Sequence, residues 1–321
     1  MTRRRLMLGF AVLVVALTAG YLVVGMGIYD QLSVAHPNCD GLWSGQTPAS
    51  YAVRGLDAHP FLMPHYQPET ISSRDPGISL SAWWIRSDAG ETAPAVVIVH
   101  GLNSCKRASD LLLAAGMLHR HGYSVLLFDL RNHGDSTIQN GRYAGGTKEY
   151  RDALGAWDSL VAGKGLAPAH VGLMGFSLGA ATALIATGEE PRVPALWEDS
   201  GYADVGAAIR AELARNGYPT WFEYAAYVAA RVETGDDLTT LSPARAVIKL
   251  HGRPLFITHG TADTRLSVQY AADLANDYRA GGGTVDPWIV SGSEHVAAII
   301  DHPTEYEQRL VAFFDRTIGP P

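Results

Sequence analysis

The chain has 321 residues, a length that suits one large domain with insertions better than two equal domains. It is 47% hydrophobic and 18% charged, which is typical of a globular protein and argues against disorder. The net charge is -7, from 25 basic and 32 acidic residues, and the basic residues do not cluster beyond the N-terminus. This excludes an electrostatic surface for nucleic acid and favours a small-molecule or lipidic substrate.

Residues 1–29 are expected to form a membrane anchor. Three arginines, Arg3 to Arg5, precede an apolar run from Leu6 to Tyr29 that contains no charged side chain. A membrane-spanning helix needs about 20 apolar residues, whereas a cleaved signal peptide has an apolar region of about 7 to 15. The length therefore favours a single-pass anchor over the alternative, a secreted protein cleaved near Ser33 or Ala35. Because the next basic residue is Arg54, the N-terminus should be cytoplasmic and the rest of the chain extracytoplasmic.

Residues 30–50 are rich in Gly, Pro, Ser and polar side chains, and we expect them to form a linker that holds the domain off the membrane. The folded domain is then predicted to span residues 51–321. The chain has two cysteines, Cys39 and Cys105. Two unpaired thiols are expected, because nothing in the sequence brings these residues together; a single disulfide in an oxidising compartment is the alternative.

The domain should be of the α/β class. Two strands, 69–73 and 78–86, are followed by short apolar runs that alternate with segments of helix length, which predicts a doubly wound, mostly parallel sheet. The further expected strands are 95–99, 124–129, 171–174, 193–198, 255–258 and 285–290. The expected helices are 109–121, 149–162, 178–187 and 268–280.

One connection is far longer than the others. About 50 residues separate the strand that ends near Asp199 from the strand that starts at Leu255, whereas such connections usually have about 2 to 6 residues. We expect a short helical cap, inserted at about 203–250, that overhangs a pocket. Its Trp221 and Phe222 supply apolar surface suited to an acyl chain.

The pattern GxSxG is formed by Gly175, Phe176, Ser177, Leu178 and Gly179. An apolar strand precedes it and a helix rich in small residues follows it. This strand, turn and helix are the context in which a serine stands on a sharp turn as a nucleophile. We therefore expect Ser177 to be the nucleophile, with the amides at the start of the helix facing a developing oxyanion.

A serine nucleophile needs a base, which in turn needs an orienting acid. Asp263 follows the strand that starts at Leu255, and His295 follows the last strand, so both should lie at the carboxyl edge of the sheet in the order Ser, acid, His. Asp199, at the end of the preceding strand, is the alternative acid. No pair of histidines has the spacing of metal ligands, and no metal or other cofactor is expected.

From about Glu69 to the C-terminus the chain resembles the alpha/beta-hydrolase superfamily. The matching stretches are the GxSxG motif, the loop from His100 to Ser104, and residues 122–136, 148–160 and 260–263. Within that superfamily it is similar to bacterial hydrolases related to dienelactone hydrolases and to prolyl-oligopeptidase-type or acylaminoacyl-peptidase-type enzymes. The resemblance implies an oxyanion hole made by the amides of Leu102 and Leu178. Asn103, Phe176, Trp221 and Phe222 are the candidate pocket residues.

These features predict a serine hydrolase that cleaves carboxylic esters through an acyl-enzyme. Peptidase, amidase or thioesterase activity on the same scaffold is the alternative, since relatives of this kind include all of them. Dehalogenases and epoxide hydrolases of this fold carry an aspartate where this chain has Ser177. A non-catalytic binding module is disfavoured because all three triad positions are filled.

Overall fold

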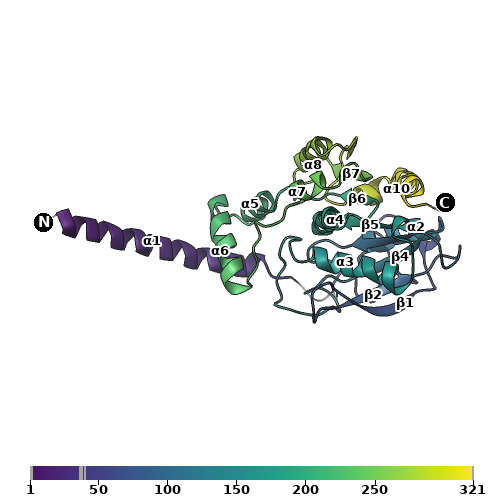
Figure 1. The fold of residues 1–321 in the computed structure, drawn as a ribbon, viewed down its shortest axis with the longest axis horizontal. Helices are drawn as coiled ribbons and strands as arrows, with labels where there is room; N and C mark the ends of the chain where they lie inside the picture. Colours follow the sequence, from purple (N-terminus) through teal and green to yellow (C-terminus); the bar gives the residue numbers. More distant parts are fainter. Residues whose placement is uncertain (1–2, 36–38, 40, 320–321) are drawn as a thin grey trace.

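The computed structural model describes residues 3–35, 39 and 41–319, and an eight-stranded sheet forms its centre (Figure 1). The strands lie in the order β1-β2-β4-β3-β5-β6-β7-β8. β2 pairs antiparallel with both of its neighbours, and all the other strands run parallel. The predicted mostly parallel sheet is therefore confirmed. The strands are β1 Gln67–Ser72, β2 Ser79–Ile85, β3 Ala95–Val99, β4 Ser124–Phe128, β5 Val171–Phe176, β6 Leu196–Asp199, β7 Leu255–Gly260 and β8 Trp288–Val290.

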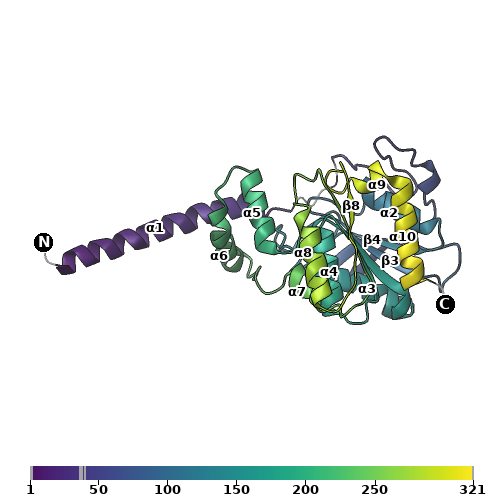
Figure 2. The ribbon, with the colours of Figure 1, turned by 90° about the horizontal axis from the view of Figure 1, so that it is seen from above.

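Helices cover both faces of the sheet, as Figure 2 shows from above. One face carries α3 Tyr150–Asp158, α4 Leu178–Glu189, α7 Pro243–Ile248 and α8 Gln269–Ala280. The other face carries α2 Ser109–His119, α9 Ala298–Asp301 and α10 Pro303–Thr317. Because both faces are covered, the central strands β3, β4 and β5 are buried along their whole length.

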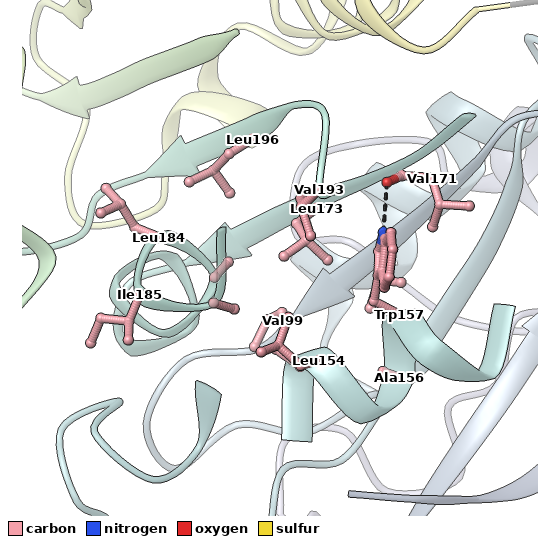
Figure 3. Close-up of a cluster of buried hydrophobic side chains, with 14 of the residues drawn as sticks. Val99, Leu154, Ala156, Trp157, Val171, Leu173, Leu184, Ile185, Val193 and Leu196 are labelled. Carbon is pink, nitrogen blue, oxygen red and sulfur yellow. Dashed lines mark hydrogen bonds between the residues drawn. The ribbon is translucent and has the colours of Figure 1, made fainter. Parts of the chain in front are cut away.

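The core beneath β5 fixes the strand that leads to Ser177 (Figure 3). Trp157 of α3 is fully buried and donates its indole N–H to the carbonyl of Val171 at 2.9 Å, so its one polar atom is satisfied. Leu173 of β5 packs in the same cluster as Leu154 of α3 and Leu184 of α4. The strand before the nucleophile and the helix after it are therefore both held by tight apolar packing.

Two strands begin three residues later than the sequence predicts, and proline is the reason in both places. β6 was expected from Val193 and starts at Leu196, and β8 was expected from Val285 and starts at Trp288. Pro194 and Pro287 lie in the missing portions. Proline has no N–H to donate to a sheet, so each ladder starts after it.

The apolar N-terminal segment forms one long helix, α1 Arg3–Leu32, which projects away from the domain (Figures 1 and 2). By length and composition this helix is able to cross a membrane. Its outer part is exposed, whereas Gly25, Ile28 and Tyr29 are buried. The buried part packs against the cap helix α6 Glu223–Glu233.

The segment after α1 does not hold the domain at a distance from the helix. Helix α1 continues to Leu32, and Val34 then forms a β-bridge with Arg142 of the domain. The amide of Ala35 donates to the carbonyl of Gly141 at 2.8 Å. The described part of residues 30–50, expected to form a linker that holds the domain off the membrane, thus packs on the domain; residues 36–38 and 40 lie outside the described residues. Gln46 of the same segment donates to the carbonyl of Arg107 at 3.0 Å and accepts the amide of Ala52 at 2.8 Å.

Cys39 and Cys105 form a disulfide, with their Cα atoms 6.3 Å apart. The expectation of two unpaired thiols was wrong. Cys105 follows β3, and both cysteines are buried. The pairing was invisible in the sequence because it depends on the N-terminal segment returning across the domain, over a separation of 66 residues.

The inserted cap consists of α5 Val205–Arg215, the short 3-10 helix η4 Thr220–Phe222 and α6. The expected insertion ran to about residue 250. The last helix of that interval, α7, contacts α4 and α8 and thus belongs to the layer on the sheet. The cap proper therefore ends before α7, and it lies between α1 and the sheet (Figure 1).

Candidate active site

Ser177 stands on a strained turn between β5 and α4. Its φ of 54° and ψ of -119° are unusual for a residue with a side chain. The amide of Ser177 donates to the carbonyl of Asp199 at 2.8 Å, which ties the turn to the end of β6. A Cβ at Gly175 would overlap the backbone of Gly179, and a Cβ at Gly179 would overlap the backbone of Val99. The two glycines of the motif are needed because backbone approaches backbone here.

The structure brings Ser177, His295 and Asp263 together. Nε2 of His295 lies 2.8 Å from Oγ of Ser177, and Nδ1 of the same ring lies 2.7 Å from Oδ2 of Asp263. The hydrogen bond to the carboxylate places the ring proton on Nδ1, so Nε2 is free to accept the hydroxyl proton of Ser177. The three residues come from three separate loops at the carboxyl edge of the sheet, where binding crevices of such sheets lie.

A second histidine also faces Asp263. Nε2 of the buried His259 lies 3.0 Å from Oδ2 of Asp263 and 3.1 Å from the carbonyl of Leu266. The other carboxylate oxygen, Oδ1, accepts the amides of Arg265 and Leu266, each at 2.8 Å. Burial by itself raises the pKa of Asp263, but the hydrogen bonds from His259 and His295 outweigh it and hold that pKa well below its usual value. Asp263 is therefore a carboxylate at neutral pH, and each of its two oxygens contacts two hydrogen-bond donors.

Sequence reasoning did not find the contact between His259 and Asp263. The available signal was the spacing of four residues at the end of β7, which places both side chains at the same edge of the sheet.

Asp199, the alternative acid, forms its hydrogen bonds with other side chains. Its two carboxylate oxygens accept the hydroxyls of Ser200 and Tyr306, each at 2.7 Å. Burial raises the pKa of Asp199. The neighbouring Glu198 is also buried, and burial raises its pKa to about 8. These acids lie in the core beside the site, and neither forms a hydrogen bond with the ring of His295 in the described part of the chain.

The loop after β3 lies against the nucleophile. A Cβ on Gly101 would come within 3.2 Å of the Cβ of Ser177, so the loop that carries Leu102 is in close contact with the serine. His100 anchors this loop: its Nδ1–H donates to the carbonyl of Gly101 at 2.7 Å, and its Nε2 accepts the amide of Leu130 at 3.0 Å. Complete burial lowers the pKa of His100, so the ring is neutral and keeps this pair of hydrogen bonds.

A narrow cavity of about 70 Å³ opens beside Ser177. Both candidate oxyanion residues, Leu102 and Leu178, line it. The remaining walls are mostly apolar and come from the cap and from loops at the sheet edge: Tyr143, Gly145, Tyr202, Val205, Ala208, Ile209, Glu212, Arg265 and Leu266. Most of these side chains escaped the sequence predictions. Tyr143 and Tyr202 follow strands β4 and β6, and that position at the carboxyl edge was the only available signal.

The four candidate pocket residues lie outside the lining of this cavity. Phe176 is buried in the core on the face that carries α2 and α10. Asn103 occupies the loop after β3 with a φ of 56°. Trp221 and Phe222 are on the cap but stack on Tyr21 of α1, with ring centroids 5.4 and 5.3 Å apart. The cap contributes to the cavity through α5 rather than through η4.

The sheet order, the turn at Ser177 and the edge that carries His295 define the class of protein: this is an alpha/beta hydrolase of the serine type. Within this class, the chain can also be assigned to a family. Residues 113–321 match the model of the prolyl oligopeptidase family, and the chain belongs to that family.

The chain is similar to proteins that have several different activities. A thiohydrolase of Aspergillus aculeatus, aneE, is 36% identical over 100 residues, which is 31% of this chain and 31% of that protein, so the chain matches about a third of its curated relative. The Pyrococcus furiosus esterase Pf2001 has a similar fold, with a TM-score of 0.66 and 22% identity over 89% of this chain and 99% of its own. An acylaminoacyl peptidase of Pyrococcus horikoshii gives a TM-score of 0.60 and 17% identity over 79% of this chain and 42% of its own. At these identities the two structures share the fold alone.

Proposed function

We propose that the protein is a carboxylic ester hydrolase that works through an acyl-enzyme, with Ser177 as nucleophile, His295 as general base and Asp263 as orienting acid. The observation that carries the proposal is the continuous hydrogen-bonded series from Ser177 Oγ through the His295 ring to Asp263, at 2.8 and 2.7 Å. No metal is needed for this chemistry.

The reaction has two steps. Ser177 Oγ attacks the ester carbonyl while its proton passes to Nε2 of His295; the alkoxide then leaves with that proton, and the acyl group stays on Ser177. Water attacks the acyl-enzyme with His295 as base, which releases the acid and restores the hydroxyl. The amides of Leu102 and Leu178 are suited to stabilise the oxyanion of both steps, since both residues line the cavity beside Ser177.

The cavity favours an ester of an apolar acid over a peptide. Its walls are largely apolar, and Glu212 and Arg265 are the charged side chains among the lining residues. A peptide would bury backbone amides and carbonyls there with few partners, which is costly. Thioester cleavage uses the same steps and is the second candidate, supported by the similarity of 100 residues to a thiohydrolase.

We further propose that α1 anchors the chain in a membrane with the hydrolase domain on the extracytoplasmic side. The arginines before the apolar run support this orientation, as does the Cys39–Cys105 disulfide, since such bridges persist in oxidising compartments. Retention of the full-length chain in membranes after a high-salt wash would support the anchor, and a mature N-terminus near residue 36 would indicate signal-peptide cleavage.

The test of the activity is Ser177→Ala in the full-length chain. Hydrolysis of nitrophenyl esters and labelling by a fluorophosphonate should both be lost, while the circular dichroism spectrum is unchanged. Ester turnover near that of the wild type, measured on protein free of contaminating hydrolases, would refute the role of Ser177. Aminoacyl anilides and acyl thioesters assayed beside the esters separate the candidate activities.

A further inference from the structure

A second cavity lies between the cap and α1. It measures about 60 Å³, and four of its lining residues, Ile28, Tyr29, Leu32 and Ser33, come from α1 and the residue that follows it. Most of its other walls come from the cap, including Leu213 of α5 and Ala226 of α6. The end of helix α1 therefore forms one side of a cavity in the hydrolase domain, whereas the earlier part of the helix is apolar and exposed.

This cavity adjoins the cavity at Ser177. The two share five lining residues, Tyr143, Gly145, Val205, Ile209 and Glu212. Val205 and Ile209 are one turn apart on α5, so this face of α5 separates the nucleophile from α1. Val205 and Ile209 therefore lie in the wall common to the two cavities, between Ser177 and the end of α1.

The position of the second cavity along α1 can be calculated. A helix rises 1.5 Å per residue, so the roughly 30 Å of a bilayer core takes about 20 residues, which from Leu6 ends near Gly25. Ile28 and Leu32 then lie about 5 to 10 Å beyond the hydrocarbon. The second cavity is therefore immediately outside the membrane boundary.

Aromatic side chains gather near this boundary, and Tyr21 lies four residues, or about 6 Å, before Gly25. The hydroxyl of Tyr21 on α1 donates to the carbonyl of Trp221 at 2.9 Å and accepts the amide of Ala225 at 3.0 Å. Trp221 and Tyr224 of the cap are 55% and 67% exposed despite their size. Tyrosine and tryptophan are enriched where hydrocarbon meets water, so this side of the cap is suited to rest on the bilayer surface.

We propose that α1 is the distal wall of the acyl-binding site, and that the substrates are esters of medium or long acyl chains taken from the membrane on which the cap rests. The inference depends on the ester hydrolase activity proposed above. Each cavity holds on the order of five groups the size of a water molecule or a methylene. The acyl chain starts at Ser177, passes Val205 and Ile209, and ends against Ile28 and Leu32.

Two glycines of α1 provide a matched pair of variants in the full-length protein. A Cβ at Gly25 would overlap the Cβ of Ala225 on α6, whereas a Cβ at Gly27 would have nothing within 4 Å in the described structure. Gly25→Leu should therefore push α1 away from the cap and open the distal wall. Gly27→Leu makes the same chemical change without affecting this contact.

The measurement is the ratio of kcat/KM for nitrophenyl dodecanoate to that for nitrophenyl acetate, in one detergent. We expect Gly25→Leu to lower this ratio at least tenfold and Gly27→Leu to leave it within twofold of the wild type. An unchanged ratio in Gly25→Leu, or an equal fall in both variants, would overturn the proposal. Fluorophosphonate labelling of Ser177 reports whether the site of each variant is intact.

A second variant tests the proposal independently, in case Gly25→Leu misfolds. Leu32 is only partly buried, and Leu32→Ala enlarges the distal cavity, so the preferred chain should become longer. The same optimum as the wild type would contradict a role of α1 in acyl binding. If the wild type hydrolyses no ester of any chain length, the proposed function itself fails, and this outcome is distinct from an unchanged ratio.

Discussion

Replacing Asp263 by asparagine should disable the site for a reason that follows from its four hydrogen bonds. Oδ1 accepts hydrogen bonds from the amides of Arg265 and Leu266, and Oδ2 accepts from ring N–H groups of His259 and His295. Asparagine has one oxygen and one NH2 group, so it can replace only one of these acceptors. Backbone amides cannot change their protonation, and the oxygen should stay with them. The NH2 group then faces the two histidines.

The effect on His295 determines the size of the loss. To accept a hydrogen bond from the new NH2 group, Nδ1 must give up its proton, which moves to Nε2. A proton on Nε2 prevents the ring from accepting the proton of Ser177. The same change of tautomer in a well-studied protease costs about 10,000-fold in kcat, or about 5 kcal/mol of transition-state stabilisation. We expect a loss of this order for Asp263→Asn.

The assay is hydrolysis of nitrophenyl acetate by the purified full-length chain, with Asp199→Asn as the matched control. Asp199 accepts two hydroxyls, from Ser200 and Tyr306, and hydroxyl groups can rotate to donate or accept, so the control should cost less than tenfold. A loss below 100-fold in Asp263→Asn, or a larger loss in the control, would refute this reasoning.

Two further predictions concern stability. The pKa of Glu198 is raised from 4.5 to about 8 by burial, so the folded state binds a proton that the unfolded state has released; stability should fall by a few kcal/mol as pH rises from about 4.5 to 8. Glu198→Gln should remove most of this dependence in thermal unfolding followed by circular dichroism, and equal slopes in both proteins would argue against it. The Cys39–Cys105 bridge spans 66 residues, and its loss in Cys39→Ser should lower the free energy of unfolding by about 4 kcal/mol. Thiol alkylation of the wild type should occur only after reduction; labelling without reductant would contradict the bridge.

The central sheet and the candidate site were predictable because their signals are local. An apolar run with a turn at each end predicts a buried strand wherever it lies, and the GxSxG motif specifies its own backbone shape. The positions of Asp263 and His295 followed from a general rule, that strands of a parallel sheet present their carboxyl ends at one edge. The errors at strand ends arose at Pro194 and Pro287, where a missing N–H outweighs an apolar pattern.

What the sequence did not predict depends on pairs of residues that are far apart in the chain. Tyr21 packs on Trp221 across 200 residues, and Cys39 bonds to Cys105 across 66. In neither pair does the local sequence around one residue indicate its partner. Trp221 and Phe222 were interpreted as pocket residues because they supply apolar surface suited to an acyl chain, but both rings stack on Tyr21 of α1. The contact of His259 with Asp263 is an exception, since the two residues are only four apart; it was missed because a histidine at a strand end has many ordinary uses.

The Cys39–Cys105 bridge has a consequence for how the chain responds to proteases. A single cut anywhere between these two cysteines leaves both fragments in one covalent molecule, so the cut is visible by electrophoresis only after reduction. A cut before Cys39 instead separates α1 from the domain whether or not reductant is present. Comparing reduced and unreduced samples of a protease-treated preparation therefore distinguishes release of the domain from a cut between residues 39 and 105, and mass spectrometry of the fragments locates the site.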